Sequence, residues 1–106
     1  MGYSPVINNQ STYAAPTTGQ TVAVPSFGGS EYNVFLEPAG LLAALTLTFS
    51  TTNLIDGQII NISCSQIVTT LTMTGGTILG ALTTIAANGV ARFGYSATGN
   101  KWFRLT

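Results

Sequence analysis

The stretch that decides the fold is Ala44-Leu45-Thr46-Leu47-Thr48-Phe49, in which apolar and polar side chains alternate. Successive side chains of a strand point to opposite faces, so Leu45, Leu47 and Phe49 share one side of an extended segment. The segment from Ile67 to Thr74 alternates in a similar way. Both segments are therefore predicted to be β-strands with one buried face.

Turn signals separate further strand-like segments on both sides of this stretch. Asp56-Gly57 precedes Ile59 to Cys64, and Asn88-Gly89 precedes Val90 to Ser96. Dipeptides of this kind favour hairpin turns. Upstream, Tyr32 to Leu36 is rich in aromatic and β-branched residues. Short strands with a turn signal roughly every 8 to 12 residues are typical of an all-β fold, and we expect a small antiparallel β-sandwich or barrel.

The predicted core consists of apolar side chains on the inward faces of these strands. They are Leu45, Leu47, Phe49, Ile60, Ile62, Leu71, Met73, Phe93 and Phe103. Trp102 and Phe103 are adjacent, so alternation allows only one of the two to face the core.

Residues 1–30 differ in composition from the rest of the chain. Three of the four prolines, Pro5, Pro16 and Pro25, lie there, and no periodic pattern persists. We predict an extended N-terminal arm over residues 1–30 and one β-domain over residues 31–106. A disordered tail is the alternative, but the segment carries more apolar surface than a solvated tail usually does. The candidate contact residues of the arm are Tyr3, Val6, Ile7, Tyr13, Val22, Val24 and Phe27.

Charged side chains are scarce. They make up 6% of the chain, whereas about 25% is usual in a soluble domain, and the formal net charge is zero. Three dispersed basic residues are too few for a nucleic-acid footprint. The stretch Leu41 to Phe49 is far too short to span a membrane, and no secretion signal is visible at the start. We therefore expect neither nucleic acid nor a membrane as a partner.

The charge deficit predicts self-association. Edge strands need charge, proline or cover to avoid pairing with other sheets, and this chain has little charge to offer. A closed symmetric assembly supplies that cover, and we expect a homotrimer. The alternative is a monomer whose surface is polar through threonine and serine.

The residue types argue against catalysis. The chain has no histidine, and Cys64 is its one cysteine. Glu31 and Glu37 lie six residues apart on one predicted strand, roughly 20 Å, which is too far for a glycosidase pair. Asp56 before Gly57 is typical of a turn. We expect no enzymatic activity, no metal and no cofactor.

Two surface motifs remain open. Arg92, Tyr95, Trp102 and Arg104 lie on the last two strands, where aromatic and basic groups could contact a sugar or a protein partner, or pack in an interface. Thr-x-Thr patterns at 46/48 and 70/72/74 resemble the ladders of ice-binding solenoids. That architecture needs a fixed short repeat, and the 24-residue offset between these patterns argues against it.

Three parts of the chain resemble phage virion proteins. The first is Glu37-Pro38-Ala39-Gly40 before the Leu-Thr alternation, and the second is Asp56-Gly57-Gln58 before an Ile-rich strand. The third is the end from Ala86 to Leu105, which contains Asn88-Gly89-Val90-Ala91-Arg92-Phe93 and Gly99-Asn100-Lys101-Trp102-Phe103-Arg104. This end is similar to the closing hairpin of small trimeric β-modules in tail fibres, head fibres and capsid decoration (cement) proteins. The resemblance covers about residues 31–106.

The resemblance implies adhesion and carries no catalytic residues. It implies a trimer on the outer surface of the phage particle, with the N-terminal segment as the attachment element. Only 30 residues precede the module, without a heptad pattern or a shaft repeat. This favours a decoration protein bound to the major capsid protein. The alternative is a fibre-tip module that binds a host glycan.

Overall fold

The computed structural model describes residues 11–106, and all regular structure in that range is β, which confirms the predicted all-β class. The strands are β1 (Ser11–Ala14), β2 (Thr21–Val24), β3 (Glu31–Leu36), β4 (Leu45–Phe49), β5 (Ile59–Cys64), β6 (Leu71–Thr74), β7 (Ile78–Leu79), β8 (Gly89–Ser96) and β9 (Lys101–Arg104).

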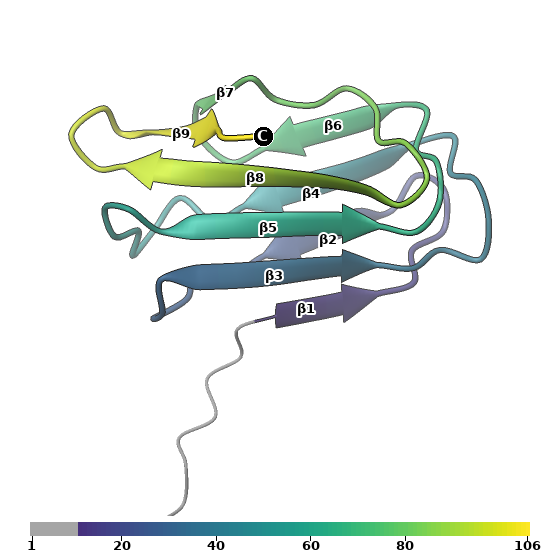
Figure 1. Cartoon of the computed structure of the whole chain (residues 1–106), viewed down its shortest axis with the longest axis horizontal. Helices are drawn as coiled ribbons and strands as arrows, with labels where there is room; N and C mark the ends of the chain where they lie inside the picture. Colours follow the sequence, from purple (N-terminus) through teal and green to yellow (C-terminus); the bar gives the residue numbers. More distant parts are fainter. Residues whose placement is uncertain (1–10) are drawn as a thin grey trace, which may run out of the picture.

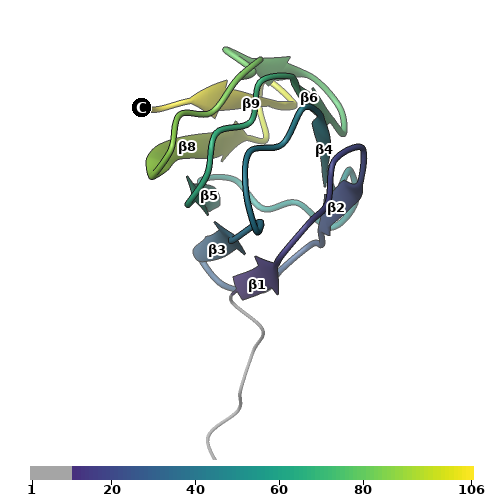
Figure 2. The same ribbon diagram turned by 90° about the vertical axis from the view of Figure 1, so that its right-hand side faces the viewer.

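The strands form two sheets that face each other (Figure 1). The larger sheet has the order β1-β3-β5-β8-β9-β7, and the smaller sheet has the order β2-β4-β6. Up to β6 the chain alternates between the sheets, and β1, β3 and β5 pair in parallel, as do β2, β4 and β6. The chain thus winds through three coils, β1–β2, β3–β4 and β5–β6, in the manner of a short β-solenoid (Figure 2).

The predicted antiparallel sandwich or barrel is therefore wrong in its strand directions. Asp56-Gly57 does form a turn, with Gly57 at a φ of 83°, but the strands on either side of it belong to different sheets. The Asp-Gly pattern predicted the turn correctly. It did not predict which strands pair with each other, because a turn signal alone does not specify strand pairing. Among the described strands, the antiparallel pairs are β5 with β8 and β8 with β9.

The C-terminal segment closes one end of the solenoid. β8 and β9 extend the larger sheet beyond β5, and β7 pairs in parallel with β9. On the other side, Ile85 forms an antiparallel bridge with Val68, and the Leu71 amide donates to the carbonyl of Thr83 (2.8 Å). Residues 83–85 therefore cover the edge of the third coil beside β6.

Residues 11–30 are part of the folded domain, which corrects the prediction of an arm over residues 1–30. They supply β1 and β2, and Val22, Val24 and Phe27 are buried. The buried amide of Gln58 donates to the carbonyls of Phe27 (2.7 Å) and Gly29 (3.0 Å) and so fixes the segment after β2. Pro16 and Pro25 lie outside the strands, so neither ring interrupts strand pairing.

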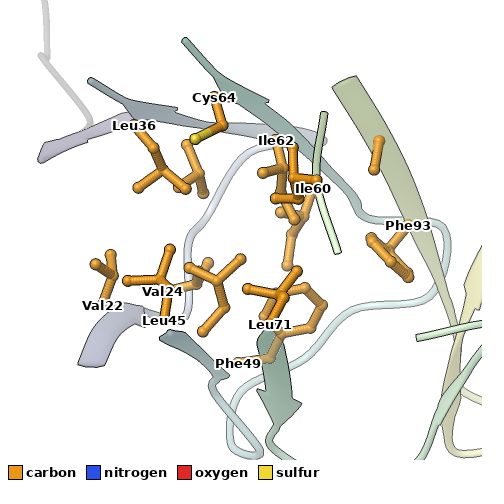
Figure 3. Close-up of a cluster of buried hydrophobic side chains, with 14 of the residues drawn as sticks. Val22, Val24, Leu36, Leu45, Phe49, Ile60, Ile62, Cys64, Leu71 and Phe93 are labelled. Atoms are coloured by element: carbon orange, nitrogen blue, oxygen red, sulfur yellow. The ribbon is translucent and has the colours of Figure 1, made fainter. Parts of the chain in front are cut away.

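The core lies between the two sheets (Figure 3). Of the predicted core residues, the buried ones are Leu45, Leu47, Phe49, Ile60, Ile62, Leu71 and Phe93. Met73 is half-buried and packs against this cluster. The prediction that Phe103 faces the core is wrong, since Phe103 is 39% exposed. Its neighbour Trp102 is 1% exposed and takes the inward position. The register pairs Trp102 with Tyr95, and the indole packs edge-on against Phe49 at a centroid distance of 5.4 Å.

Phe93 and Phe103 offer a matched test of this assignment. Phe93→Ala should lower the free energy of unfolding by about 3–5 kcal/mol, because Phe93 is fully buried and its removal leaves a cavity. Phe103→Ala should cost about 1 kcal/mol or less, since much of that ring is exposed in the single chain. Chemical denaturation at low protein concentration measures both. Equal losses would contradict the assigned faces.

Gly75 is the glycine that the fold requires most strictly. Its φ is 108°, and a Cβ there would collide with the carbonyl of Phe49. Gly75→Ala should therefore destabilise the protein by more than about 1 kcal/mol. Gly28→Ala is the control, because Gly28 has open space around it and no positive φ. A loss of similar size in the control would show that the close approach to Phe49 is not the cause.

Candidate functional site

The outward side of the larger sheet is the surface on which exposed apolar groups gather, and we call it the outer face. Strand register aligns its residues in three rows. The first row is Tyr13, Phe35, Ser63 and Val90; the second is Ser11, Asn33, Asn61 and Arg92; the third is Glu31, Ile59, Gly94, Phe103 and Leu79.

The first and third rows are largely apolar. Val90 is 69% exposed, Tyr13 65% and Phe35 46%. Phe103 and Leu79 are exposed in the third row. The outer face thus presents exposed apolar side chains on both sides of the polar second row.

A hollow lies on the outer face between the first and second rows. Its volume is about 370 Å³, and its lining includes Phe35, Val90, Arg92 and Thr106. A neighbouring hollow of about 300 Å³ lies towards β1, between Tyr13, Phe35 and Asn88. Both are shallow hollows in the surface of the sheet.

Asn61 of the second row links an acidic residue of the third row, Glu31, to a basic residue of the second row, Arg92. The Asn61 amide nitrogen donates to Glu31 Oε1 (2.8 Å) and to Asn33 Oδ1 (3.1 Å). Arg92 Nε donates to Asn61 Oδ1 (2.9 Å). Glu31 and Arg92 are therefore held in fixed positions by a neutral side chain that lies between them.

Tyr13 and Glu37 form a second polar contact at the β1 edge of the outer face. The Tyr13 hydroxyl donates to Glu37 Oε1 at 2.7 Å. This hydrogen bond and the negative charge of Glu37 raise the pKa of Tyr13 above its ordinary value. The contact fixes an exposed aromatic ring at the edge of the sheet.

The structure separates the aromatic and basic residues that the sequence grouped together. Arg92 is exposed on the outer face, whereas Tyr95 points the other way and packs on Trp102 at a centroid distance of 5.1 Å. Trp102 is buried, so its ring cannot stack on a sugar from outside. Arg104 is exposed at the end of β9. The reason is strand alternation, since Arg92 and Tyr95 differ by an odd number of residues.

The predicted arm residues also divide. Tyr3, Val6 and Ile7 lie outside the described residues. Tyr13 belongs to the outer face, whereas Val22, Val24 and Phe27 belong to the core of the same chain. Those three side chains therefore stabilise the domain and are not available to a capsid.

The carboxylates and the thiol of the described residues each have a partner within the fold. Asp56 Oδ1 accepts the amide of Ala97 (2.8 Å), while Glu31 and Glu37 accept the bonds given above. Cys64 is buried and donates to the carbonyl of Gln66. Within residues 11–106, His, Cys, Asp and Glu form no cluster that could hold a metal ion. The same residues contain no helix long and apolar enough to cross a membrane.

The smaller sheet carries two outward columns of short side chains. Register places Thr21, Thr46 and Thr72 in one column and Ala23, Thr48 and Thr74 in the other. The hydroxyls of Thr48 and Thr74 are 2.9 Å apart. The two Thr-x-Thr patterns do stack on each other. The offset of 24 residues was counted from Thr46 to Thr70, whereas the register pairs Thr46 with Thr72.

No protein-family model, no curated protein and no solved structure matches this chain. The outer face is therefore interpreted from its own residues.

Sequence analysis did not identify Phe35 and Val90 as surface residues. Their signal was alternation: Phe35 lies between the buried residues Val34 and Leu36.

The Tyr13–Glu37 contact can be tested by titration. Because the pKa of Tyr13 is raised, any stabilisation linked to its proton is present below its ordinary pKa of about 10 and is lost as pH rises through the raised value. Glu37→Gln removes the charge, so the pKa of Tyr13 should fall towards 10. Absorbance of the tyrosinate band measures it, with Tyr13→Phe to identify the signal.

Glu31→Gln serves as the control, because Glu31 accepts from Asn61 rather than from a tyrosine. It should leave the pKa of Tyr13 nearly unchanged. An unaltered tyrosine titration in Glu37→Gln would refute the coupling.

Proposed function

We propose that this protein is a structural, non-enzymatic component of a phage virion, a capsid decoration (cement) protein that acts as a homotrimer. The observation that supports this most directly is the outer face, whose apolar rows are exposed in a chain with 6% charged residues. Such a face must be covered to remain soluble, and other copies of the chain are the simplest cover. The resemblance of residues 31–106 to trimeric virion β-modules supports the same role.

The proposed location is the outer surface of the particle, and the proposed partner is the major capsid protein. We assign attachment to residues 1–10, with Tyr3, Val6 and Ile7 as contact residues, because residues 11–30 are needed inside the domain. Tyr13 lies at the boundary and is exposed. Three such segments on one trimer would raise the effective concentration of each for the shell.

A fibre-tip module that binds a host glycan is the second candidate. The observation that favours it is the difference between the two ends of the solenoid. The C-terminal end is covered by β7, β8 and β9 and by residues 83–85, whereas β1 and β2 are edge strands of the described part of the chain. Coils of a longer shaft could continue the parallel sheets from β1 and β2.

Deletion of residues 1–10 separates attachment from assembly. We expect the shortened chain to fold and to form trimers, since β1 to β9 are retained, and to lose binding to phage particles stripped of this protein. Mass photometry measures the assembly, and co-sedimentation with particles measures the binding. Salt should have little effect on binding, because residues 1–10 carry no charged side chain.

The full-length chain is the control in both measurements. Undiminished decoration by the shortened chain would overturn the attachment role of residues 1–10. Binding of the full-length chain to host cells but not to stripped particles would favour the fibre-tip module instead.

A further inference from the structure

The two halves of the outer face carry opposite charge. On the β1–β3 side, Glu31 lies in β3 and Glu37 follows it. On the β8–β9 side lie Arg92 and Lys101, whereas register places Arg104 opposite the buried Phe93 and so on the other face of the sheet. β5 separates the halves and contributes Asn61 between Glu31 and Arg92. The acidic half and the basic half are thus complementary in charge.

Both halves also carry exposed apolar side chains. The acidic half presents Tyr13 and Phe35, and the basic half presents Val90 and Phe103. The hollow of about 370 Å³ beside Phe35 and Val90 offers space for an aromatic side chain from outside. Contact between an acidic half and a basic half would therefore cover apolar surface and bring opposite charges together.

The charged groups are held ready for such a contact. Within the described residues, the hydrogen bond of the Arg92 guanidinium is the one that Nε donates to Asn61 Oδ1, and no described residue accepts from its terminal nitrogens. Glu31 Oε1 accepts from Asn61, and no residue of the described range donates to Glu31 Oε2. Arginine pairs well with a carboxylate through two parallel hydrogen bonds. Since Asn61 fixes both side chains, little conformational freedom is lost when they pair.

We propose that the outer face is the contact between copies of this chain, with the acidic half of one copy packed on the basic half of the next. In this contact Arg92 of one copy faces Glu31 of its neighbour. A head-to-tail contact of this kind uses a different half towards each neighbour, and a threefold rotation between copies closes it into a ring of three. The inference rests on the proposed trimer and adds the surface and the residues that form it.

Charge reversal tests the pairing. Glu31→Arg and Arg92→Glu should each weaken assembly by at least about tenfold in the concentration of half-association, because like charges then face each other. The double variant Glu31→Arg/Arg92→Glu restores opposite charges and should regain most of the loss. Analytical ultracentrifugation measures assembly, and circular dichroism with thermal unfolding shows whether each variant is folded.

A mixture of the two single variants tests whether the pairing is between copies. Arg92 of the first variant then meets Glu31 of the second, so mixed rings should form. A ring of three must keep one contact between like variants, so recovery should be partial. An interaction confined to one chain would give no recovery on mixing.

Val90 gives a test that does not depend on Asn61 or on ion pairs. Val90→Glu adds a charge to an exposed position on the outer face and should abolish assembly while the fold is kept. Leu41→Glu adds the same charge at a position that is 60% exposed and lies outside the three rows, and it should leave assembly intact.

The outcomes separate this inference from the proposed function. Trimers that persist in Val90→Glu and in both charge variants would overturn the assigned contact but leave the trimer standing. A wild-type chain that stays monomeric or dimeric at micromolar concentration would overturn both. Loss in Val90→Glu without rescue in the double variant would overturn the Arg92–Glu31 pairing.

Discussion

Parallel pairing between successive coils is the constraint on which the rest of this structure depends. Each coil must return in register, so that inward side chains stack on inward side chains. The register does this in both sheets: Tyr32, Ile60 and Phe93 align in the larger sheet, and Val22, Leu47 and Met73 align in the smaller one. A slip by one residue would turn every apolar group of a strand towards solvent. The core therefore fixes the register, and the register fixes the outer surface.

The same register explains why the outer face is organised in rows. Asn33 lies beside Asn61 because their strands are parallel and in step, and Arg92 joins them because β8 continues the sheet. Tyr13, Phe35 and Val90 are aligned for the same reason, although they are far apart in sequence. Because their neighbours along each strand point into the core, alternation places these side chains on the outer surface. A chain with few charges then presents exposed apolar side chains on this face.

The sequence supported the identification of strands better than their arrangement. Alternation located β4 and β6, and residue type located β3 and β5, because side-chain period and β-propensity are local properties. The relative direction of paired strands is not a local property, because strands that pair among β1 to β6 are separated along the chain by a strand of the other sheet. Asp56-Gly57 forms its turn, yet it connects a strand of the smaller sheet to a strand of the larger one. Coil lengths also differ, since Ser11 pairs with Asn33 and Glu31 with Ile59, so no repeat is visible in the sequence.

The sequence by itself determined the all-β class, most of the core and the shortage of charge, because composition and alternation carry that information directly. It also limited the choice at the last strand to Trp102 or Phe103. Only the tertiary structure decided that Trp102 is buried, because pairing with β8 and contact with Phe49 select its face. Only the tertiary structure drew residues 11–30 into the first coil, since backbone pairing with β3 and β4 lies far along the chain. The acidic and basic halves likewise arise from strand order, which places residues distant in sequence on one surface.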